Sequence, residues 1–265
     1  DPTNPSRSYS HIFQKRFHGN LDSGYAFLED AIAKKVPGAG YIVLSQILTS
    51  KPHNVVITTN FDDLAADAVR MYTNSIAREC VHESLSHFAL HEIRNPLILK
   101  IHRGLLFHPK NSPEAIAELA HGWHEPLESI LTRYSPIVIG YGGSDASLMD
   151  FLLSISQANS KSKILGGVTW CYRHEDEISK NEKISELVTK SQGRFVKIGG
   201  FDEFMFQLGS QIGLTNVHDQ ISENFATTLN NYRNSYRECL GSIFSNLRES
   251  DDPSLMTVKA ALLNT

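Results

Sequence analysis

The stretch from Val55 to Leu64 constrains the fold of this chain more than any other part of it. An apolar, β-branched run over residues 55–59 ends abruptly at the polar side chains of Asn60 and Asp62, and a helical pattern follows. Such a run is typical of a strand covered on both faces, as in parallel α/β sheets. In open sheets of this kind, ligands bind beyond the carboxyl ends of the strands. The stretch therefore predicts a buried strand that ends in a polar site.

Two later strands are predicted to end in the same way. Leu97 to Ile101 leads to His102, and Ile137 to Tyr141 leads to the loop Gly142 to Asp145. Strands that alternate with helices indicate a parallel sheet with helices on both faces. We therefore expect a doubly wound, mostly parallel α/β sheet in which the three strand ends meet at one cleft.

The other predicted elements continue this pattern as far as Leu214. Helical patterns cover Leu21 to Lys35, Tyr41 to Leu48, Asp62 to Tyr72, Ser112 to Arg133, Ala146 to Gln157, Asp176 to Ser191 and Phe201 to Ile212, and further strands cover Ile164 to Cys171 and Phe195 to Ile198. The segment Gly38-Ala39-Gly40 does not fit a phosphate-binding loop, because a helix rather than a strand precedes it. We expect Gly40 to open the following helix instead.

Composition limits the domain organisation. A chain of 265 residues with 41% hydrophobic residues can bury one substantial core. We expect one α/β domain over residues 1–214 and a helical segment over 215–265. The helical segment carries apolar residues at steps of three or four, namely Phe225, Leu229, Tyr232, Tyr236, Leu240 and Phe244. This stripe predicts packing on the domain, on a second copy in a homo-oligomer or on a partner protein, with a partner subunit favoured.

Charge and cysteine content exclude several function classes. A net charge of -4 argues against a generally basic nucleic-acid binder. The three cysteines form no Cys-x-x-Cys pair, so they support neither a disulfide framework nor a cysteine zinc module. No run of apolar residues is long enough to cross a membrane, and the N-terminus lacks a signal-peptide pattern. We expect a cytoplasmic protein.

One polar cluster, formed by Cys80, His82, Glu83, His87 and His91, could bind a metal. His87 and His91 would share a helix face at a spacing that suits a metal ion. No third ligand or open-site motif accompanies them. We therefore predict no metal site.

Four motifs together resemble a known family. They are Thr58-Thr59-Asn60-Phe61-Asp62-Asp63-Leu64, then His102 at a strand end, then Gly140-Tyr141-Gly142-Gly143-Ser144-Asp145, then Gly199-Gly200-Phe201-Asp202-Glu203-Phe204. Their order and placement from about Pro37 to Leu214 resemble the Rossmann-like fold of sirtuins. More narrowly, the motifs resemble bacterial sirtuin-like NAD hydrolases of anti-phage defence systems.

The resemblance implies a role for each matched residue. Asn60 matches the catalytic asparagine of the family, Asp62 the aspartate beside the nicotinamide pocket, and His102 the catalytic histidine. It implies that the following residues bind NAD, which is the substrate: Thr58, Thr59, Phe61, Gly140, Tyr141, Gly142, Ser144, Asp145, Gly199, Gly200 and Phe201. It also implies that the stretches from Gly140 and from Gly199 lie near the ribose and the adenine.

The sequence departs from the family in two places. The glycine-rich first β-α unit that holds the pyrophosphate is not found in residues 1–265, so we expect these residues to be part of a longer protein in which that unit lies upstream of Asp1. Arg103 follows His102 where relatives usually place glycine, so the backbone geometry at this position is not implied by the resemblance.

The chemistry of these residue types suits cleavage of the bond between nicotinamide and ribose. That reaction builds positive charge on the sugar, as in glycoside hydrolysis. Asp62 can interact with this charge or hold the nicotinamide amide, Asn60 can orient a hydroxyl or water, and His102 can accept a proton near neutral pH. Each residue also has a structural interpretation, because Asn60 and Asp62 are common in helix caps and Asx turns, and a single histidine is often a buried core residue.

Three functions remain open at this point. The first is an NAD hydrolase that depletes cellular NAD. The second is a module that binds NAD or ADP-ribose without cleaving it and acts through its C-terminal helix. The third is a protein deacylase of the ordinary sirtuin type, which is less favoured because three scattered cysteines cannot build its four-cysteine zinc module.

Overall fold

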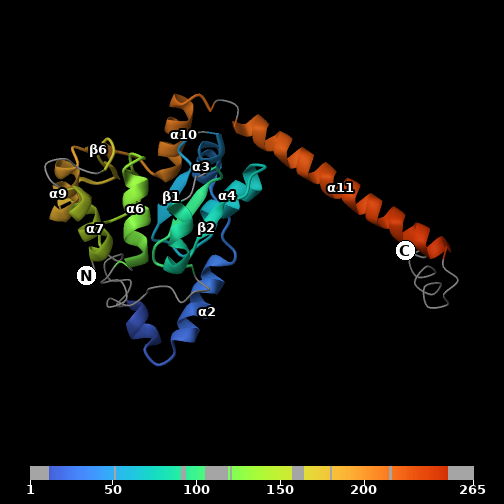
Figure 1. Cartoon of the computed structure of the whole chain (residues 1–265), viewed down its shortest axis with the longest axis horizontal. Helices are drawn as coiled ribbons and strands as arrows, with labels where there is room; N and C mark the ends of the chain where they lie inside the picture. The colour runs from blue at the N-terminus through green and yellow to red at the C-terminus, as the bar shows by residue number, and fades with distance from the viewer. Residues whose placement is uncertain are drawn as a thin grey trace. The chain divides into compact units, whose positions relative to one another are not determined.

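The computed structural model describes residues 12–50, 52–90, 94–104, 119, 121–156, 164–179, 181–214 and 217–249. The chain divides into two compact units, Asp1–Thr215 and Asn216–Thr265. The first unit is an α/β domain, and the second contains one long helix (Figure 1).

The first sheet of the domain carries two of the predicted strand ends. Its order is β1-β3-β2, with bounds Val55–Thr58 for β1, Leu97–Lys100 for β3 and Arg78–Cys80 for β2. Both pairs are parallel, and Thr58 is the register partner of Lys100. Every residue of the central strand β3 is buried. The sequence did not predict β2, because three residues are too few for a period to show.

The second sheet has the order β4-β5-β6 and is also parallel throughout. Its strands are Ile137–Val138 (β4), Thr169–Tyr172 (β5) and Arg194–Lys197 (β6). The parallel α/β pattern is confirmed, but the described strands form two three-stranded sheets rather than one continuous sheet. A side-chain hydrogen bond of 3.3 Å from Tyr134 Oη to Asn54 Oδ1 joins the segments that lead into β4 and β1.

Helices cover both sheets (Figure 1). They are α2 (Leu21–Ile32), α3 (Ala39–Ser50), α4 (Leu64–Tyr72), η1 (Glu83–Leu90), η3 (His121–Trp123), α6 (His124–Leu131), α7 (Ala146–Ser156), α8 (Glu175–Ser179), α9 (Glu182–Lys190) and α10 (Phe201–Gln211). The helix α3 packs against α4 and α10, α6 packs against η1, and α7 packs against α9.

Two predicted boundaries were wrong, and a third cannot be compared with the described residues. The strand predicted from Ile164 begins only at Thr169, because Gly166 and Gly167 adopt positive φ angles of 65° and 74° in a turn. The helix predicted over residues 176–191 is interrupted, since Asn181 caps a new helix by accepting a hydrogen bond from its backbone. The predicted helix start at residues 112–114 lies outside the described residues.

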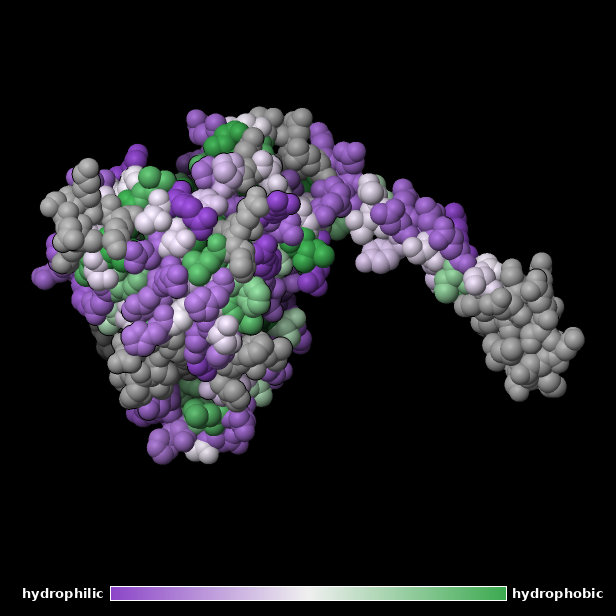
Figure 2. All heavy atoms as spheres, in the orientation of Figure 1, coloured by the Kyte–Doolittle hydropathy of each residue, from purple (hydrophilic) through white to green (hydrophobic). Residues whose placement is uncertain are grey.

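The core is mainly one hydrophobic cluster beneath the two sheets. Its largest fully buried side chains include Trp123, Trp170 and Met149. A smaller cluster of Val43, Ile47 and Met205 joins α3 to α10. Full burial of a large apolar side chain contributes about 1.5–3 kcal/mol, so both clusters stabilise the domain. The face drawn in Figure 2 is mostly hydrophilic or neutral, with hydrophobic residues in small patches.

The second unit contains α11, a helix of 33 residues from Val217 to Glu249. The sequence predicted this helix from the polar pattern that starts at Thr215. Within the described residues, no helix combines the length and the apolar character that crossing a membrane would require.

Candidate functional site

The register of the first sheet places two predicted catalytic residues at the same level. Thr58 pairs with Lys100, and both strands run in the same direction. Asn60 and His102 each follow two residues later, at the carboxyl ends of β1 and β3. Parallel strands bring such positions to one edge of the sheet. The prediction that these strand ends meet is therefore supported for β1 and β3.

His102 is joined to the loop after β4 by a short hydrogen bond. Its Nε2 atom lies 2.6 Å from Oδ2 of Asp145. Both side chains are buried, with 7% of each exposed. This contact joins the end of β3 to the loop between β4 and α7, which belongs to the second sheet, so the candidate site includes residues that follow strands of both sheets.

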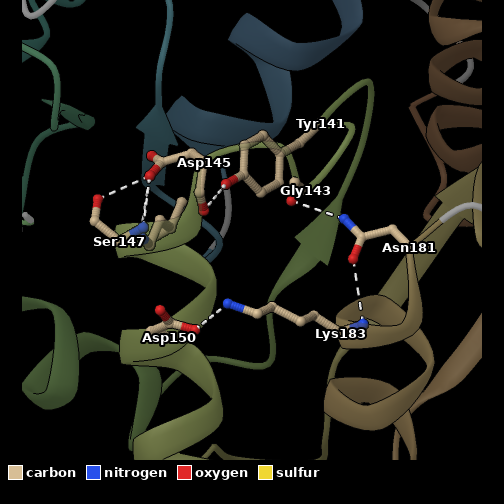
Figure 3. Close-up of polar contacts among 8 residues, drawn as sticks. Tyr141, Gly143, Asp145, Ser147, Asp150, Asn181 and Lys183 are labelled. Atoms are coloured by element: carbon tan, nitrogen blue, oxygen red, sulfur yellow. Dashed lines mark hydrogen bonds and ion pairs between the residues drawn. The ribbon is translucent and has the colours of Figure 1, made fainter. Parts of the chain in front are cut away.

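Asp145 is held in place by the start of α7 (Figure 3). Its Oδ1 atom accepts hydrogen bonds from the backbone N–H of Ser147 at 3.0 Å, from the Ser147 hydroxyl at 2.7 Å and from the backbone N–H of Leu148 at 3.2 Å. A carboxylate that caps a helix in this way leaves its other oxygen for a second partner. Here that partner is His102.

These contacts determine which ring nitrogen of His102 remains for a ligand. Burial raises the pKa of Asp145, but the hydrogen bond and charge of His102, together with Ser147 and Leu148, lower it, and the net shift is downward. Nε2 of His102 donates the hydrogen bond that the Asp145 carboxylate accepts. The other ring nitrogen, Nδ1, is buried and makes no hydrogen bond within the described part of the chain. Nδ1 is therefore the ring atom that remains for a contact with a ligand.

The loop that carries Asp145 is shaped by its glycines. Gly140 and Gly143 adopt φ angles of 69° and 63°, which strongly favour glycine. The carbonyl of Gly143 accepts a 2.8 Å hydrogen bond from Asn181 Nδ2 (Figure 3). The hydroxyl of Tyr141 donates a 3.3 Å hydrogen bond to the Asp145 carbonyl, and burial raises the pKa of this phenol. The loop thus places Asp145 while leaving Gly142 exposed.

The loop after β1 has its own local hydrogen bonds. The hydroxyl of Thr58 accepts a 3.0 Å hydrogen bond from the backbone N–H of Asn60. Asp62 Oδ1 accepts a 3.2 Å bond from the backbone N–H of Leu64, the first residue of α4. This contact is an Asx turn, whereas the N-cap residue of α4 is Asp63, whose side chain makes no cap hydrogen bond. The Asn60 side chain is exposed, so it can contact a ligand.

Lys100 lies beneath this loop and was missed by the sequence reasoning. Its residue exposure is 1%, although it carries a charge. The Nζ atom contacts the Asp63 carboxylate, donates a 3.3 Å hydrogen bond to the Phe61 carbonyl and lies 3.8 Å from Glu79 Oε2. A buried ammonium requires such partners. A lysine inside the apolar run of β3 was the available signal for this role.

Arg103 adopts the backbone conformation that a glycine would adopt after His102. Its φ angle is 70°, the left-handed region that glycine prefers. The backbone therefore follows the path that a glycine would take. Its guanidinium donates two hydrogen bonds to the carboxylate of Glu83, one of them of 3.0 Å from Nε to Oε2. The hydrogen bond from Arg103 is the main cause that lowers the pKa of Glu83 to about 2.

The starts of α3 and α10 meet near Asp62. The backbone N–H of Gly40 donates a 2.8 Å hydrogen bond to Asp202 Oδ1, and a Cβ at Gly40 would lie 2.5 Å from that atom. The rings of Tyr41 and Phe201 are 5.1 Å apart. The pKa of Tyr41 is raised by burial, then by the charges of Asp62 and Asp202. Gly40 therefore opens a helix, as predicted, and Tyr41 is a site residue that the sequence reasoning missed.

The structure places the other predicted residues around this edge. Thr59 and Phe61 are half-buried in the loop after β1, and Ser144 is exposed beside Asp145. Gly199 and Gly200 directly precede α10, which brings Phe201 against α3. Their contacts with NAD stay predictions.

The polar cluster that was considered as a metal site lies around η1, and two of its side chains make contacts with other residues. His82 Nδ1 lies 2.9 Å from the Ser84 hydroxyl, and Glu83 binds Arg103. His91 lies outside the described residues. In the part of the chain that the structure describes, no group of three or more His, Cys, Asp or Glu side chains could hold a metal ion.

Residues 54–191 match the family model of the SIR2-like domain, which is just over half of the 265 residues. The chain therefore belongs to the SIR2-like domain family. The matched segment includes Asn60, Asp62, His102 and Asp145. No curated protein matches the chain. Membership of this family indicates NAD-related chemistry.

Proposed function

We propose that this protein is an NAD hydrolase that cleaves the bond between nicotinamide and ribose. The observation that carries the proposal is the buried pair of His102 and Asp145 at the edge where Asn60 is exposed. Family membership supplies the substrate class. The pair supplies a proton acceptor, which the hydrolysis requires.

The reaction converts NAD and water into nicotinamide, ADP-ribose and one proton. The bond from the anomeric carbon to the nicotinamide nitrogen breaks, and its electron pair leaves with nicotinamide. The water oxygen forms a new bond to the same carbon. His102 accepts the proton at Nδ1 and returns it to solvent, while Asp145 stabilises the imidazolium.

The residues of the β1 loop act on the sugar. Positive charge develops on the ribose ring as nicotinamide leaves. The Asp62 carboxylate stabilises this charge, and the Asn60 amide orients the attacking water or a ribose hydroxyl. Lys100 holds the loop that presents both groups through its contacts with Phe61 and Asp63.

The biological role we propose is NAD depletion in bacterial anti-phage defence. It is supported by the order of the four motifs that resemble the sirtuin-like NAD hydrolases of such systems. Depletion of a shared cofactor would stop phage replication in an infected cell.

A direct assay tests the proposed reaction. The protein is incubated with NAD, and nicotinamide and ADP-ribose are quantified by chromatography. We expect both products in equal amounts from the wild type and none from His102→Ala. The matched control is His53→Ala, which removes an exposed histidine that precedes β1. Absence of products from the folded wild type, with and without phage lysate, would refute the proposal.

A second candidate is a module that binds NAD or ADP-ribose without cleaving it. It is favoured by the burial of His102, whose exposure is only 6%. Isothermal titration separates the two candidates. Binding of NAD with no nicotinamide release would support the binding module.

A further inference from the structure

The apolar stripe of α11 has a symmetric spacing. Over residues 221–240, where the structure describes every side chain, it consists of Ile221, Phe225, Leu229, Tyr232, Tyr236 and Leu240. The steps between successive members are four, four, three, four and four residues. The stripe therefore reads the same in both directions about a point between Asn230 and Asn231.

This stripe has the exposure and the geometry of an interface. Leu229, Tyr232 and Tyr236 are 51%, 72% and 66% exposed. Most of the α11 surface that is coloured in Figure 2 is hydrophilic or neutral. A helix of 33 residues is about 50 Å long. Helices gain most of their stability by packing an amphipathic face.

We propose that α11 pairs with α11 of a second copy of the chain in an antiparallel arrangement. With a two-fold axis between Asn230 and Asn231, each apolar residue of the stripe lies opposite an apolar residue of the other copy. Ile221 meets Leu240, Phe225 meets Tyr236 and Leu229 meets Tyr232, each pair being formed twice.

The spacing favours a second copy over an unrelated protein. An interface between identical subunits related by a two-fold axis must be complementary to itself, and a stripe with palindromic spacing meets that condition. The steps of four, four and three make an eleven-residue repeat, or 3.67 residues per turn. This value is close to that of a straight helix, so the stripe stays on one side over its whole length.

The position of Arg233 favours the antiparallel orientation over the parallel one. A parallel pair would place Arg233 level with Arg233 of the other copy, whereas the antiparallel pair places it level with Thr228. The antiparallel pair also places Glu223 level with Glu238, but both lie on the side of the helix that faces away from the stripe. The antiparallel pair also sets the two helix dipoles in opposite directions, which is the favourable arrangement.

The mass of the full chain in solution tests the pairing. One chain has a mass of 29.6 kDa, so we expect light scattering to give twice this value for the wild type. The double variant Leu229→Glu and Tyr232→Glu should halve the mass to that of one chain. The matched control Thr227→Glu changes the opposite side of the helix and should stay dimeric. A one-chain mass for the wild type, or a dimeric double variant, would overturn the proposal.

Cross-linking tests the orientation. Cys239 is exposed, whereas Cys80 and Cys171 are buried. In the antiparallel pair the two Cys239 residues lie about 25 Å apart along the axis, while Cys239 is level with Ser222 of the other copy. A short bismaleimide should therefore cross-link Ser222→Cys but not the wild type. Cross-linking of the wild type, or none with the Ser222→Cys variant, would overturn the antiparallel register.

Discussion

Nε2 of His102 lies 2.6 Å from Oδ2 of Asp145, across 43 positions of sequence. The contact links the end of β3 to the start of α7, and it leaves Nδ1 of the imidazole for a contact with a ligand. Replacement of the carboxylate should therefore impair proton transfer without removing the helix cap, because asparagine is also a good capping residue.

Asp145→Asn should lower kcat about 100-fold or more, which is the contribution of a positioned general base. KM should change little, and the acidic limb of the pH profile should move. The matched control is Asp150→Asn, since Asp150 also lies on α7 but pairs with Lys183 at the surface (Figure 3). An unchanged kcat in the folded Asp145→Asn variant would exclude Asp145 from the mechanism.

Asn60→Ala should stop turnover with only a modest loss of NAD affinity. An orienting contact acts on the transition state more than on the ground state. The side chain is exposed, so the free energy of unfolding should change by less than about 0.5 kcal/mol. Kinetics and titration calorimetry together check this. If the affinity for NAD falls sharply while kcat is unchanged, Asn60 binds the substrate and takes no part in the reaction.

Arg103→Gly should be more stable than Arg103→Ala by about 1 kcal/mol, because only the alanine has a Cβ at a φ angle of 70°. Both variants lose the hydrogen bonds to Glu83, so the difference between them isolates the backbone strain. Chemical denaturation measures it. Equal stability of the two would mean that residue 103 adopts a negative φ in solution.

Lys100→Met should keep the fold but loosen the loop after β1. Methionine fills the volume of the buried lysine stem, and the carboxylate of Asp63 is 64% exposed, so water can solvate it when its partner is removed. The Phe61 carbonyl and Asp63 would nevertheless lose their anchor. We expect faster hydrogen exchange at residues 60–64 and a lower kcat, with β3 amides still protected. If the variant keeps the hydrogen exchange and the kcat of the wild type, Lys100 fills the core and does not position the loop.

The contribution of ionised Glu83 to the free energy of unfolding should decrease at acidic pH. Its pKa is lowered from 4.5 to about 2, chiefly by the hydrogen bond from Arg103. The folded-state pKa is the lower one, so the contribution is complete above pH 4.5 and is lost as the pH falls toward 2. The free energy of unfolding of the wild type should exceed that of Glu83→Gln by about 1 kcal/mol at neutral pH, because solvent screens this partly exposed pair, and the difference should shrink as the pH falls below about 5. A gap that does not shrink in acid would show that ionisation of Glu83 is not involved.

Local sequence patterns determined the elements of this protein and the ends of its main strands. The β-branched run before Asn60 and the apolar run before His102 predicted β1 and β3, because burial on both faces requires continuous apolar side chains. Every residue of β3 is buried as expected, whereas those of β1 are only half-buried. The same reasoning missed β2, which is too short to show a period, and it extended β5 through the turn at Gly166 and Gly167.

Only the tertiary structure decided which side chains pair. Gly40 meets Asp202 across 162 positions, and Lys100 meets Asp63 across 37. The sequence predicted that Asp145 binds the substrate, which stays a prediction, and it gave no sign that Asp145 pairs with His102. Hydrophobic periodicity is a local property that reports which face of an element is buried. The partner of a buried polar group depends on how distant strand ends and helix starts converge, and no local pattern encodes that.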